Sequence, residues 1–525
     1  MSLEDFRVRG KEVIDFVCDY SGKVEGNRVT PDVEPGFLSR QLPKEAPKNG
    51  YHAYFPMGRG CPSLIADIIT GVLGCAGSSW LSSPACTELE TIVLDWLGKA
   101  MSIPPHFIYS TPGSTGGGVI QCSTSDCILV CMLAARTAAI KYLKEQNPDG
   151  DEHDSVYLPR LVAYTSKEAH AAVERCARIA MVRLRLLNTD NQSSLRGPTL
   201  ADAVQSDQEN GLHPFFVNCT LGTIGSCGFD NLKEIGPIVK KLPSCWLHVD
   251  ASYAGCGFIC PELRYLKEGM EFADSFNASC SKWLTITADC SCLWVKDRCK
   301  LTSSLITDPV LLQHERARQS IDYRNWGVQL SRSFKALKLW FTLRYYGVEG
   351  LQTYIRNHCK LAKEFEKLVS RDNRFELVNE VRVGLITFRL IGSDEKNQEL
   401  LAAINKEGQI HMVPARVRDK YSLRFCITHP EATQAQVDAA WNTIQKHTAE
   451  VVDRQQGEKY SEIAEEDRKR YAFVEFVPED LYYEWQSGTL TDGTGPMYVP
   501  LKMGDGTKTF TEDQEIYHDV KTILN

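Results

Sequence analysis

The 525-residue chain lacks a marked excess of charge of either sign, since 59 Lys and Arg stand against 67 Asp and Glu for a formal net charge of −8. Without a strongly basic balance, a general nucleic-acid binder or a protein of anionic membrane surfaces is disfavoured. Hydrophobic residues make up 43% and charged residues 24% of the chain, which excludes a largely disordered or low-complexity protein. We expect a folded enzyme with no nucleic-acid and no membrane partner.

Signals for export, membrane insertion and zinc ribbons are also missing. The first 20 residues mix acids and bases where a secretory signal needs an uninterrupted apolar run. The uncharged stretch from Ile68 to Thr87 has the ~20 residues that can span a membrane, but glycines, paired serines and Pro84 interrupt it. The 19 cysteines are scattered, without two CxxC pairs. These patterns predict a cytoplasmic protein with reduced thiols and no metal.

The pattern of apolar residues divides the chain into four parts. Residues 1–60 should form an amphipathic helix over 2–22 and then an extended arm with Pro31, Pro35 and Gly36. This part is too short to bury its own core, so we expect it to dock on the main body or on a second subunit.

The second part, residues 61–350, alternates helical segments with buried apolar runs at 161–165, 214–220 and 245–250, a pattern typical of an α/β domain with a mostly parallel sheet. One of its helices should start near Ser331 and stop at Gly347.

Two further parts follow. Residues 351–455 read as a helix over 351–371, strands within 375–390 and 410–428, and a helix over 432–451, which predicts a small α+β domain. Residues 456–525 are charged and then glycine-rich, so we expect a partly disordered tail.

A possible phosphate site lies near residue 120. Gly113 and Gly116 to Gly118 precede a helix whose entry carries Ser123, Thr124 and Ser125. Free backbone N–H groups and hydroxyls at a helix start favour an anion. The segment is neither a P-loop nor a GxGxxG motif. A flexible turn followed by an ordinary serine cap is the alternative reading.

Three further residues lie where strands of such a sheet end. Asp250 closes the apolar run 245–250, although it could instead cap the following turn. Lys282 is followed by apolar residues, so it is either a desolvated amine with a lowered pKa or a lysine snorkelling to the surface. His170 follows the strand 161–165. A phosphate holder, an acid, an amine and a flat ring together meet the needs of pyridoxal phosphate.

The first 450 residues resemble the animal aromatic L-amino-acid decarboxylases, group II pyridoxal-phosphate enzymes related to histidine and tyrosine decarboxylases. The resemblance rests on the strings RVTPDVEPGFL, SSPACTELETIVLDWLGKAM, GSTGGGVIQ, SKEAHAAVE, TLGTIGSCGFDNL, WLHVDASYAG, ICPEL, DYRNWGVQLSRSFKALKLWF and HMVPA. It implies the pyridoxal-phosphate-dependent transferase-like fold, fold type I. The strings ETIVLDWLGKA, SKEAH, KLTSSL and SIDYRNWG are most similar to tyrosine decarboxylases.

The resemblance also implies a role for each matching residue. Lys282 would form the Schiff base with the cofactor, Asp250 would pair with the pyridinium nitrogen, and His170 would stack on the ring and position the substrate. A homodimer with exchanged N-terminal arms is implied as well. The remaining contacts would be Ser123, Thr124, Ser125, Thr220, Thr223 and Ser279 for the cofactor, and Phe55, Met57, His170 and Ser331 for the substrate.

The chain departs from the family pattern at several positions. A segment with a His-Trp pair is missing before YHAYFP, Met57 replaces a small or hydroxyl residue, and Ile224 replaces a threonine. The residues before the lysine are Ser279, Cys280 and Ser281 instead of Asn-Pro and a variable residue. Leu311 stands in the mobile loop where relatives have a tyrosine that donates a proton, and leucine has none to give.

Three functions therefore remain open. The first is decarboxylation of an aromatic amino acid, with L-tyrosine and tyramine as substrate and product. The second, suggested by Leu311, is an oxidative aldehyde synthase on the same fold. The third is a weakly catalytic homologue that acts as a partner subunit. Ser331 resembles the serine of histidine and tyrosine decarboxylases, but a hydroxyl suits imidazole and phenol alike, so histidine and DOPA stay possible.

Overall fold

The computed structural model describes residues 7–8, 10–15, 60–147, 153–307, 320–407, 409–427 and 432–471, with side chains as far as residue 452. Residues 7–8 and 10–15 are helical and fall within the helix predicted for residues 2–22. By its internal contacts the chain divides into one unit of residues 1–453 and another of residues 454–525. In the described part, no helix is both long and apolar enough to cross a membrane.

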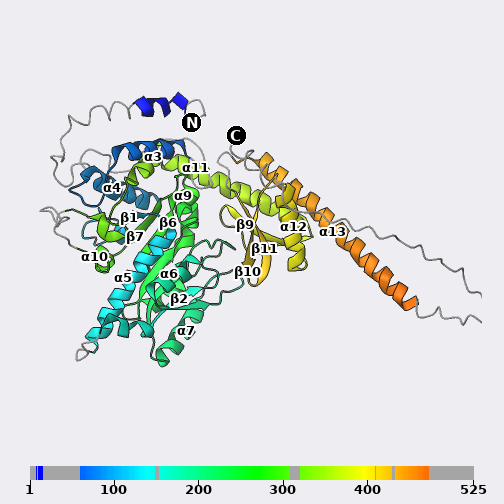
Figure 1. Cartoon of the computed structure of the whole chain (residues 1–525), viewed down its shortest axis with the longest axis horizontal. Helices are drawn as coiled ribbons and strands as arrows, with labels where there is room; N and C mark the ends of the chain where they lie inside the picture. The colour runs from blue at the N-terminus through cyan, green and yellow to red at the C-terminus, as the bar shows by residue number, and fades with distance from the viewer. Residues whose placement is uncertain are drawn as a thin grey trace, which may run out of the picture. The chain divides into compact units, whose positions relative to one another are not determined.

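The first unit is built on a seven-stranded sheet with the order β1-β7-β6-β5-β4-β2-β3 (Figure 1). Neighbouring strands are parallel except for β7, which is antiparallel to both β1 and β6. All of these strands except β3 are buried along most of their length, as the apolar runs at 161–165, 214–220 and 245–250 predicted. Their bounds are β1 Gly117–Gln121, β2 Leu161–Ser166, β3 Arg183–Leu187, β4 His213–Thr220, β5 Trp246–Asp250, β6 Ser275–Ser279 and β7 Ser291–Val295.

Helices cover both faces of this sheet, which gives the α/β architecture expected from the sequence. Helix α5 packs along one face, and α6 packs on α5 (Figure 1). Helices α4, α7 and α8 pack against the strands from the other face. These helices and the shorter ones nearby are α3 Cys61–Leu73, α4 Pro84–Ala100, α5 Thr124–Glu145, α6 Ala172–Ala180, α7 Gly197–Glu209, α8 Leu232–Val239, α9 Cys280–Trp283 and α10 Arg298–Thr302.

The side chains of the central strands alternate between two cores. On β4 and β5, Phe216 and Trp246 belong to the core beneath α5, whereas Val217 and Leu247 belong to the core on the opposite face. Because successive residues of a strand point to opposite faces, the even-numbered residues from 216 to 220 and from 246 to 250 face α5.

The glycine-rich segment differs from its prediction. Gly117 and Gly118 are not part of a loop but form the start of β1, an edge strand of the sheet. A Cβ on Gly116 would lie 2.0 Å from the carbonyl oxygen of His106 and 2.6 Å from that of Val295. The glycines therefore allow close backbone packing, and the expectation that they cradle a phosphate was wrong.

A second sheet, antiparallel and of four strands, forms the small domain in the order β10-β11-β9-β8. It is reached through the long helix α11, which breaks at Gly347, where φ is 64°. This break lies where the sequence predicted a helix to stop. The elements are α11 Ala336–Arg371, β8 Phe375–Leu377, β9 Leu385–Leu390, α12 Asp394–Glu407, β10 Val413–Val417, β11 Lys420–Cys426 and α13 Gln434–Tyr471.

Helix α13 continues to Tyr471, well beyond the predicted boundary at 455. The extra turns are rich in Glu, Lys, Arg and Gln, which have high helix propensity although they also give a segment the composition of a disordered tail.

Candidate active site

The carboxyl ends of three adjacent strands carry a row of buried polar residues that faces α5. The strand register places Thr220 of β4 beside Asp250 of β5, and Asp250 beside Asn277 of β6. One carboxylate oxygen of Asp250 accepts hydrogen bonds from the Ser252 N–H at 3.0 Å and from Asn277 Nδ2 at 3.2 Å. Asp250 is 1% exposed. Its carboxylate is thus held in one orientation at the sheet edge where α/β proteins bind ligands.

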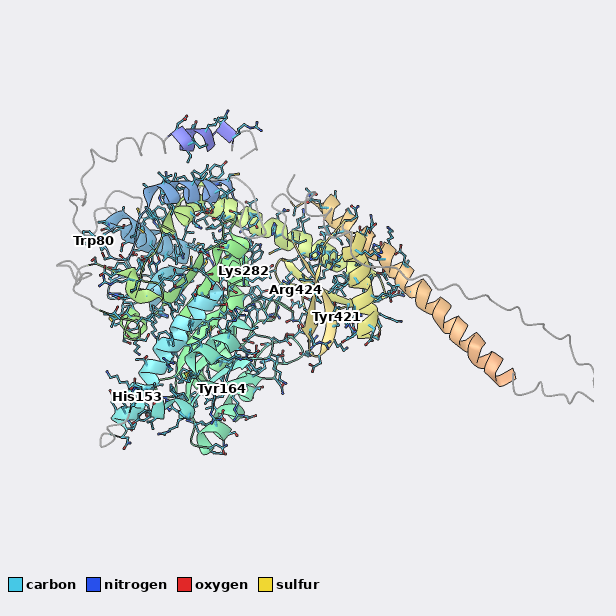
Figure 2. All side chains as sticks on the ribbon, viewed as in Figure 1. Trp80, His153, Tyr164, Lys282, Tyr421 and Arg424 are labelled. Atoms are coloured by element: carbon cyan, nitrogen blue, oxygen red, sulfur yellow. The ribbon has the colours of Figure 1, made fainter. Side chains whose placement is uncertain are left out.

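Lys282 lies in α9, directly after β6, and its Nζ donates a hydrogen bond to Ser252 Oγ at 3.0 Å. Burial lowers the pKa of the Lys282 ammonium, and the positive charge of Arg424 adds to this effect, whereas the negative charge of Asp250 opposes it. A lysine with a lowered pKa spends more time as the neutral amine that attacks an aldehyde. Figure 2 shows Lys282 and Arg424 on neighbouring parts of the large and small domains.

His170 lies in the connection between β2 and α6, and its Nδ1 accepts a hydrogen bond from the Ala172 N–H at 3.1 Å. The neutral ring therefore carries its proton on Nε2. The pKa of His170 is lowered, first because protein displaces part of its water and then because of the Lys282 charge, while Asp250 raises it. The predicted acid, amine and imidazole thus lie within electrostatic reach of one another.

At the start of α5, one hydroxyl is hydrogen-bonded within the helix cap and another is buried without a partner among the described residues. Ser123 is the N-cap, since its Oγ accepts from the Asp126 N–H and its own N–H donates back to the Asp126 carboxylate. In contrast, Oγ1 of Thr124 is buried without a hydrogen-bond partner among the described residues, and the same holds for Oγ1 of Thr220. Buried hydroxyls without partners are costly, and a bound phosphate would satisfy both.

The other predicted cofactor residues have partners within the protein. Thr223 Oγ1 lies 2.9 Å from Ser226 Oγ and accepts from the Gly228 N–H at 2.8 Å, so this hydroxyl fixes its own turn. The buried Ser279 Oγ accepts from Ser291 Oγ at 3.2 Å. Ser125 is half-buried at the start of α5.

The predicted substrate residues are less well placed. Ser331 is exposed in the segment before α11. Phe55, Met57 and Leu311 lie outside the described residues.

Sequence reasoning missed Arg424, which lies on β11 of the small sheet. Its Nε is buried without a hydrogen-bond partner in the described part of the chain. Nothing local in KYSLRFC marks this arginine, because its proximity to Lys282 depends on how the small sheet docks on the large one.

A second missed residue is His248, fully buried two positions before Asp250 on the same face of β5. Its Nδ1 lies 2.7 Å from Ser275 Oγ, which also accepts a hydrogen bond from Trp246 Nε1 at 2.7 Å. The Ser275 hydroxyl is thus shared by the indole and the imidazole, and its second lone pair and its proton allow it either to accept from or to donate to His248 Nδ1.

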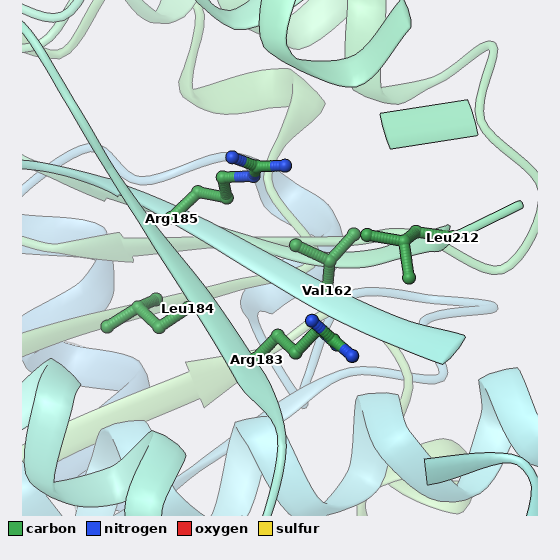
Figure 3. Close-up of a pocket in the computed structure, with 5 residues that line it drawn as sticks. All are labelled: Val162, Arg183, Leu184, Arg185 and Leu212. Carbon is green, nitrogen blue, oxygen red and sulfur yellow. The ribbon is translucent and has the colours of Figure 1, made fainter. Parts of the chain in front are cut away.

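A surface hollow of about 380 Å³ lies elsewhere, at the β2–β3 edge of the sheet (Figure 3). Two of the residues that line it are arginines, but both guanidinium groups have partners. Arg185 pairs with the buried carboxylate of Asp207, and Arg183 donates to the Pro159 carbonyl. The Arg185 charge is therefore neutralised by a carboxylate, whereas Arg183 contacts a neutral carbonyl, and the residues that line the hollow are none of the predicted site residues.

Comparison with known proteins adds independent findings. The family described as "Pyridoxal-dependent decarboxylase conserved domain" matches residues 44–391. The chain is 45% identical over 479 residues to the aromatic-L-amino-acid decarboxylase of Rattus norvegicus, covering 86% of this chain and 99% of the relative.

Two solved structures are similar over 86% of this chain and 99% of their own. They are Oryza sativa TDC with PLP and tryptamine, 32% identical with a TM-score of 0.72, and Rhodiola rosea 4-hydroxyphenylacetaldehyde synthase, 31% identical with a TM-score of 0.69.

Proposed function

Because the chain belongs to the pyridoxal-dependent decarboxylases, we propose that its substrate is an aromatic L-amino acid, with L-tyrosine first and tyramine as the product. Membership in this family makes it a carboxy-lyase that uses pyridoxal 5′-phosphate. The observation that carries the proposal is the convergence of Lys282, Asp250 and His170 at the strand ends that face α5.

The site fits this cofactor on its own chemistry. Thr124 and Thr220 offer unpartnered hydroxyls for the phosphate, and Asp250 offers a buried carboxylate for a protonated ring nitrogen. Lys282 offers an amine with a lowered pKa for the aldehyde. When bound, pyridoxal phosphate supplies the electron sink that accepts the pair released as CO2 leaves.

The residues around this position divide the remaining work. Asp250, held by Ser252 and Asn277, keeps a positive charge stable beside it and so favours the protonated ring nitrogen. His170 presents a neutral ring whose Nε2–H is a hydrogen-bond donor. We propose that Arg424 orients the carboxylate of the incoming amino acid, because its Nε lacks a protein partner and its charge reaches Lys282.

The choice of tyrosine rests on the strings shared with tyrosine decarboxylases and on the hydroxyl of Ser331. A second candidate is the oxidative reaction in which tyrosine, O2 and water give 4-hydroxyphenylacetaldehyde, CO2, ammonia and H2O2. It is supported by Leu311, which has no proton for the product, and by the similarity to a 4-hydroxyphenylacetaldehyde synthase.

We further propose a cytoplasmic homodimer with the domain limits 1–60, 61–350, 351–455 and 456–525. Support for the dimer comes from the N-terminal helix and arm, which are too short to form a core alone. Light scattering of the purified full-length chain should give twice the mass of 58.9 kDa, and a monomer would refute the dimer.

The deciding experiment incubates the cofactor-loaded protein with L-tyrosine and measures tyramine, 4-hydroxyphenylacetaldehyde and peroxide together. Parallel incubations with DOPA, histidine and tryptophan rank the substrates. We expect tyramine without peroxide, and none from Lys282→Ala. Lys267→Ala is a matched control, because Lys267 is also half-buried with a lowered pKa but donates to the Ser102 carbonyl. Aldehyde with equimolar peroxide would establish the oxidative reaction, and cofactor binding without any product would favour the partner-subunit hypothesis.

A further inference from the structure

Three buried cysteines meet beside the loop that carries Lys282. Cys280 is the first residue of α9, Cys290 immediately precedes β7, and Cys292 is the second residue of β7. Each is at most 1% exposed. The sulfur atoms of Cys280 and Cys292 are 3.4 Å apart, and all three sulfurs lie within 4.8 Å of one another.

The backbone brings these cysteines together. Strands β6 and β7 are antiparallel and pair Ala278 with Cys292. Two residues further along the chain, past the pair Ser279 and Ser291, the Cys280 N–H donates to the Cys290 carbonyl at 3.0 Å. Sheet pairing therefore fixes the backbone positions from which the three thiols approach one another.

The cluster is separate from the cofactor site. All three cysteines belong to the core on the face of the sheet opposite α5, together with Trp294. Asp250 and Asn277 face α5 instead. The cysteines therefore do not serve the decarboxylation chemistry, and the proposed function leaves them unexplained.

We propose that Cys280, Cys290 and Cys292 bind one thiophilic metal ion, Cu⁺ or Zn²⁺, as thiolates, and that binding releases the three thiol protons to solvent. A metal–sulfur bond of ~2.3 Å requires sulfur separations of ~3.8 Å in a tetrahedral site and ~4.0 Å in a trigonal one. The observed separations reach these values by shifts of less than about 1 Å, within the range of thiol rotation. In the described part of the chain, no carboxylate or imidazole joins the three sulfurs, and sulfur-only ligands favour soft ions over Mg²⁺ or Ca²⁺.

The surroundings contribute a nearby positive charge. The Nζ of buried Lys338 donates to the Ala288 carbonyl at 2.7 Å, two residues before Cys290. The same ammonium also pairs with the Asp67 carboxylate at 2.9 Å, so it offsets only a small part of the net negative charge that three thiolates keep with a monovalent or divalent ion.

Such an ion would join both ends of the segment 281–289, which contains Lys282. This segment holds two non-glycine residues with left-handed backbone, Thr285 at φ 61° and Asp289 at φ 67°. Left-handed conformations are unfavourable for these residues. A metal clip at the base of the loop would therefore stabilise a conformation that the loop backbone does not favour by itself.

The test measures metal in the full-length, cofactor-loaded protein. Reduced protein is equilibrated without oxygen against Cu⁺ in one arm and Zn²⁺ in the other, passed through a desalting column, and analysed by mass spectrometry of the elements. We expect one ion per chain in at least one arm and loss of that ion in the double variant Cys280→Ala/Cys292→Ala. Cys219→Ala, buried in β4, and Cys299→Ala, on the surface, should retain it.

Equal metal content in the double variant and in the wild type would overturn the proposal, as would a wild-type protein with no ion in either arm. If the double variant does not fold, X-ray absorption spectroscopy of the metal-loaded wild-type protein identifies the ligand atoms around the ion directly. Three sulfur neighbours at ~2.3 Å support the site, whereas nitrogen or oxygen neighbours refute it. If air-exposed protein formed a disulfide that peptide mapping assigns to Cys280 and Cys292, with O2 as the oxidant and no metal bound, the proposal would equally be overturned.

Discussion

Acidification from pH 7 to pH 5 should destabilise this protein measurably through one side chain, His248. Its ring is fully buried between Ser275 and the end of β5. Burial lowers the pKa of His248 from 6.5 to about 4, although the Asp250 charge and the nearby Asn277 side chain pull it upward. The folded protein thus keeps this histidine neutral at a pH where an unfolded chain protonates it.

The sign and size of the effect follow from linkage. Between pH 6.5 and pH 4 the unfolded state binds more protons than the folded state, so the free energy of unfolding falls as the pH falls through this window. With pKa values of 6.5 unfolded and about 4 folded, the loss between pH 7 and pH 5 is about 2 kcal/mol. Above pH 7 this contribution stays constant.

The assay is urea unfolding of cofactor-saturated wild type and His248→Gln at pH 7 and pH 5. Other groups titrate in the same range. Burial raises the pKa of Asp230 to about 7, and its contribution to stability has the opposite sign because it is lost as the pH rises. The informative quantity is therefore the difference between wild type and variant, in which such shared effects cancel.

We expect the stability advantage of the wild type over His248→Gln to shrink by about 2 kcal/mol from pH 7 to pH 5. His153→Gln is the control for the substitution itself, because it makes the same change at an exposed histidine. A pH-independent difference for His248→Gln would refute the reasoning, since it would mean that His248 is not held neutral by burial.

Three further predictions concern the cofactor site. Thr220→Val removes a buried hydroxyl without a partner, so the free energy of unfolding of the cofactor-free protein in urea should rise by about 1 kcal/mol. A fluorescence titration of the same variant should show weaker binding of pyridoxal phosphate. Unchanged cofactor affinity would contradict the phosphate assignment. Asp250→Asn should lower kcat about 100-fold or more, because the buried negative charge is lost, and activity above a tenth of wild type would refute its role. Arg424→Gln should raise the KM for L-tyrosine about tenfold with the same cofactor affinity, whereas a weakened cofactor and unchanged KM would place Arg424 on the phosphate.

The large sheet could be predicted from the sequence because its strands are continuous apolar runs. A charged or polar residue at the end of such a run also marks the carboxyl end of the strand. Asp250 and His170 were found in this way, and Lys282 was found from the apolar residues around it. These signals are local, since each depends on a few neighbouring residues and on burial.

Other features depend on contacts between distant segments. The glycines at 116–118 were misread because glycine suits both a phosphate loop and a crowded strand, and only the positions of His106 and Val295 decide between the two. Arg424 and His248 were missed for the same kind of reason. The position of Arg424 depends on how the two sheets dock, and the environment of His248 depends on Ser275 of the adjacent strand β6.

The alternation along β5 has a consequence for how this protein tolerates change. Asp250 and Val249 are neighbours in the chain but belong to different surroundings, one at the polar edge beneath α5 and the other in the apolar core of the opposite face. Inserting a single residue in β5 ahead of these two would shift the strand register by one and exchange them. A change in the length of a surface loop leaves this alternation intact, whereas a one-residue change within a central strand moves the residues that follow to the opposite face of the sheet.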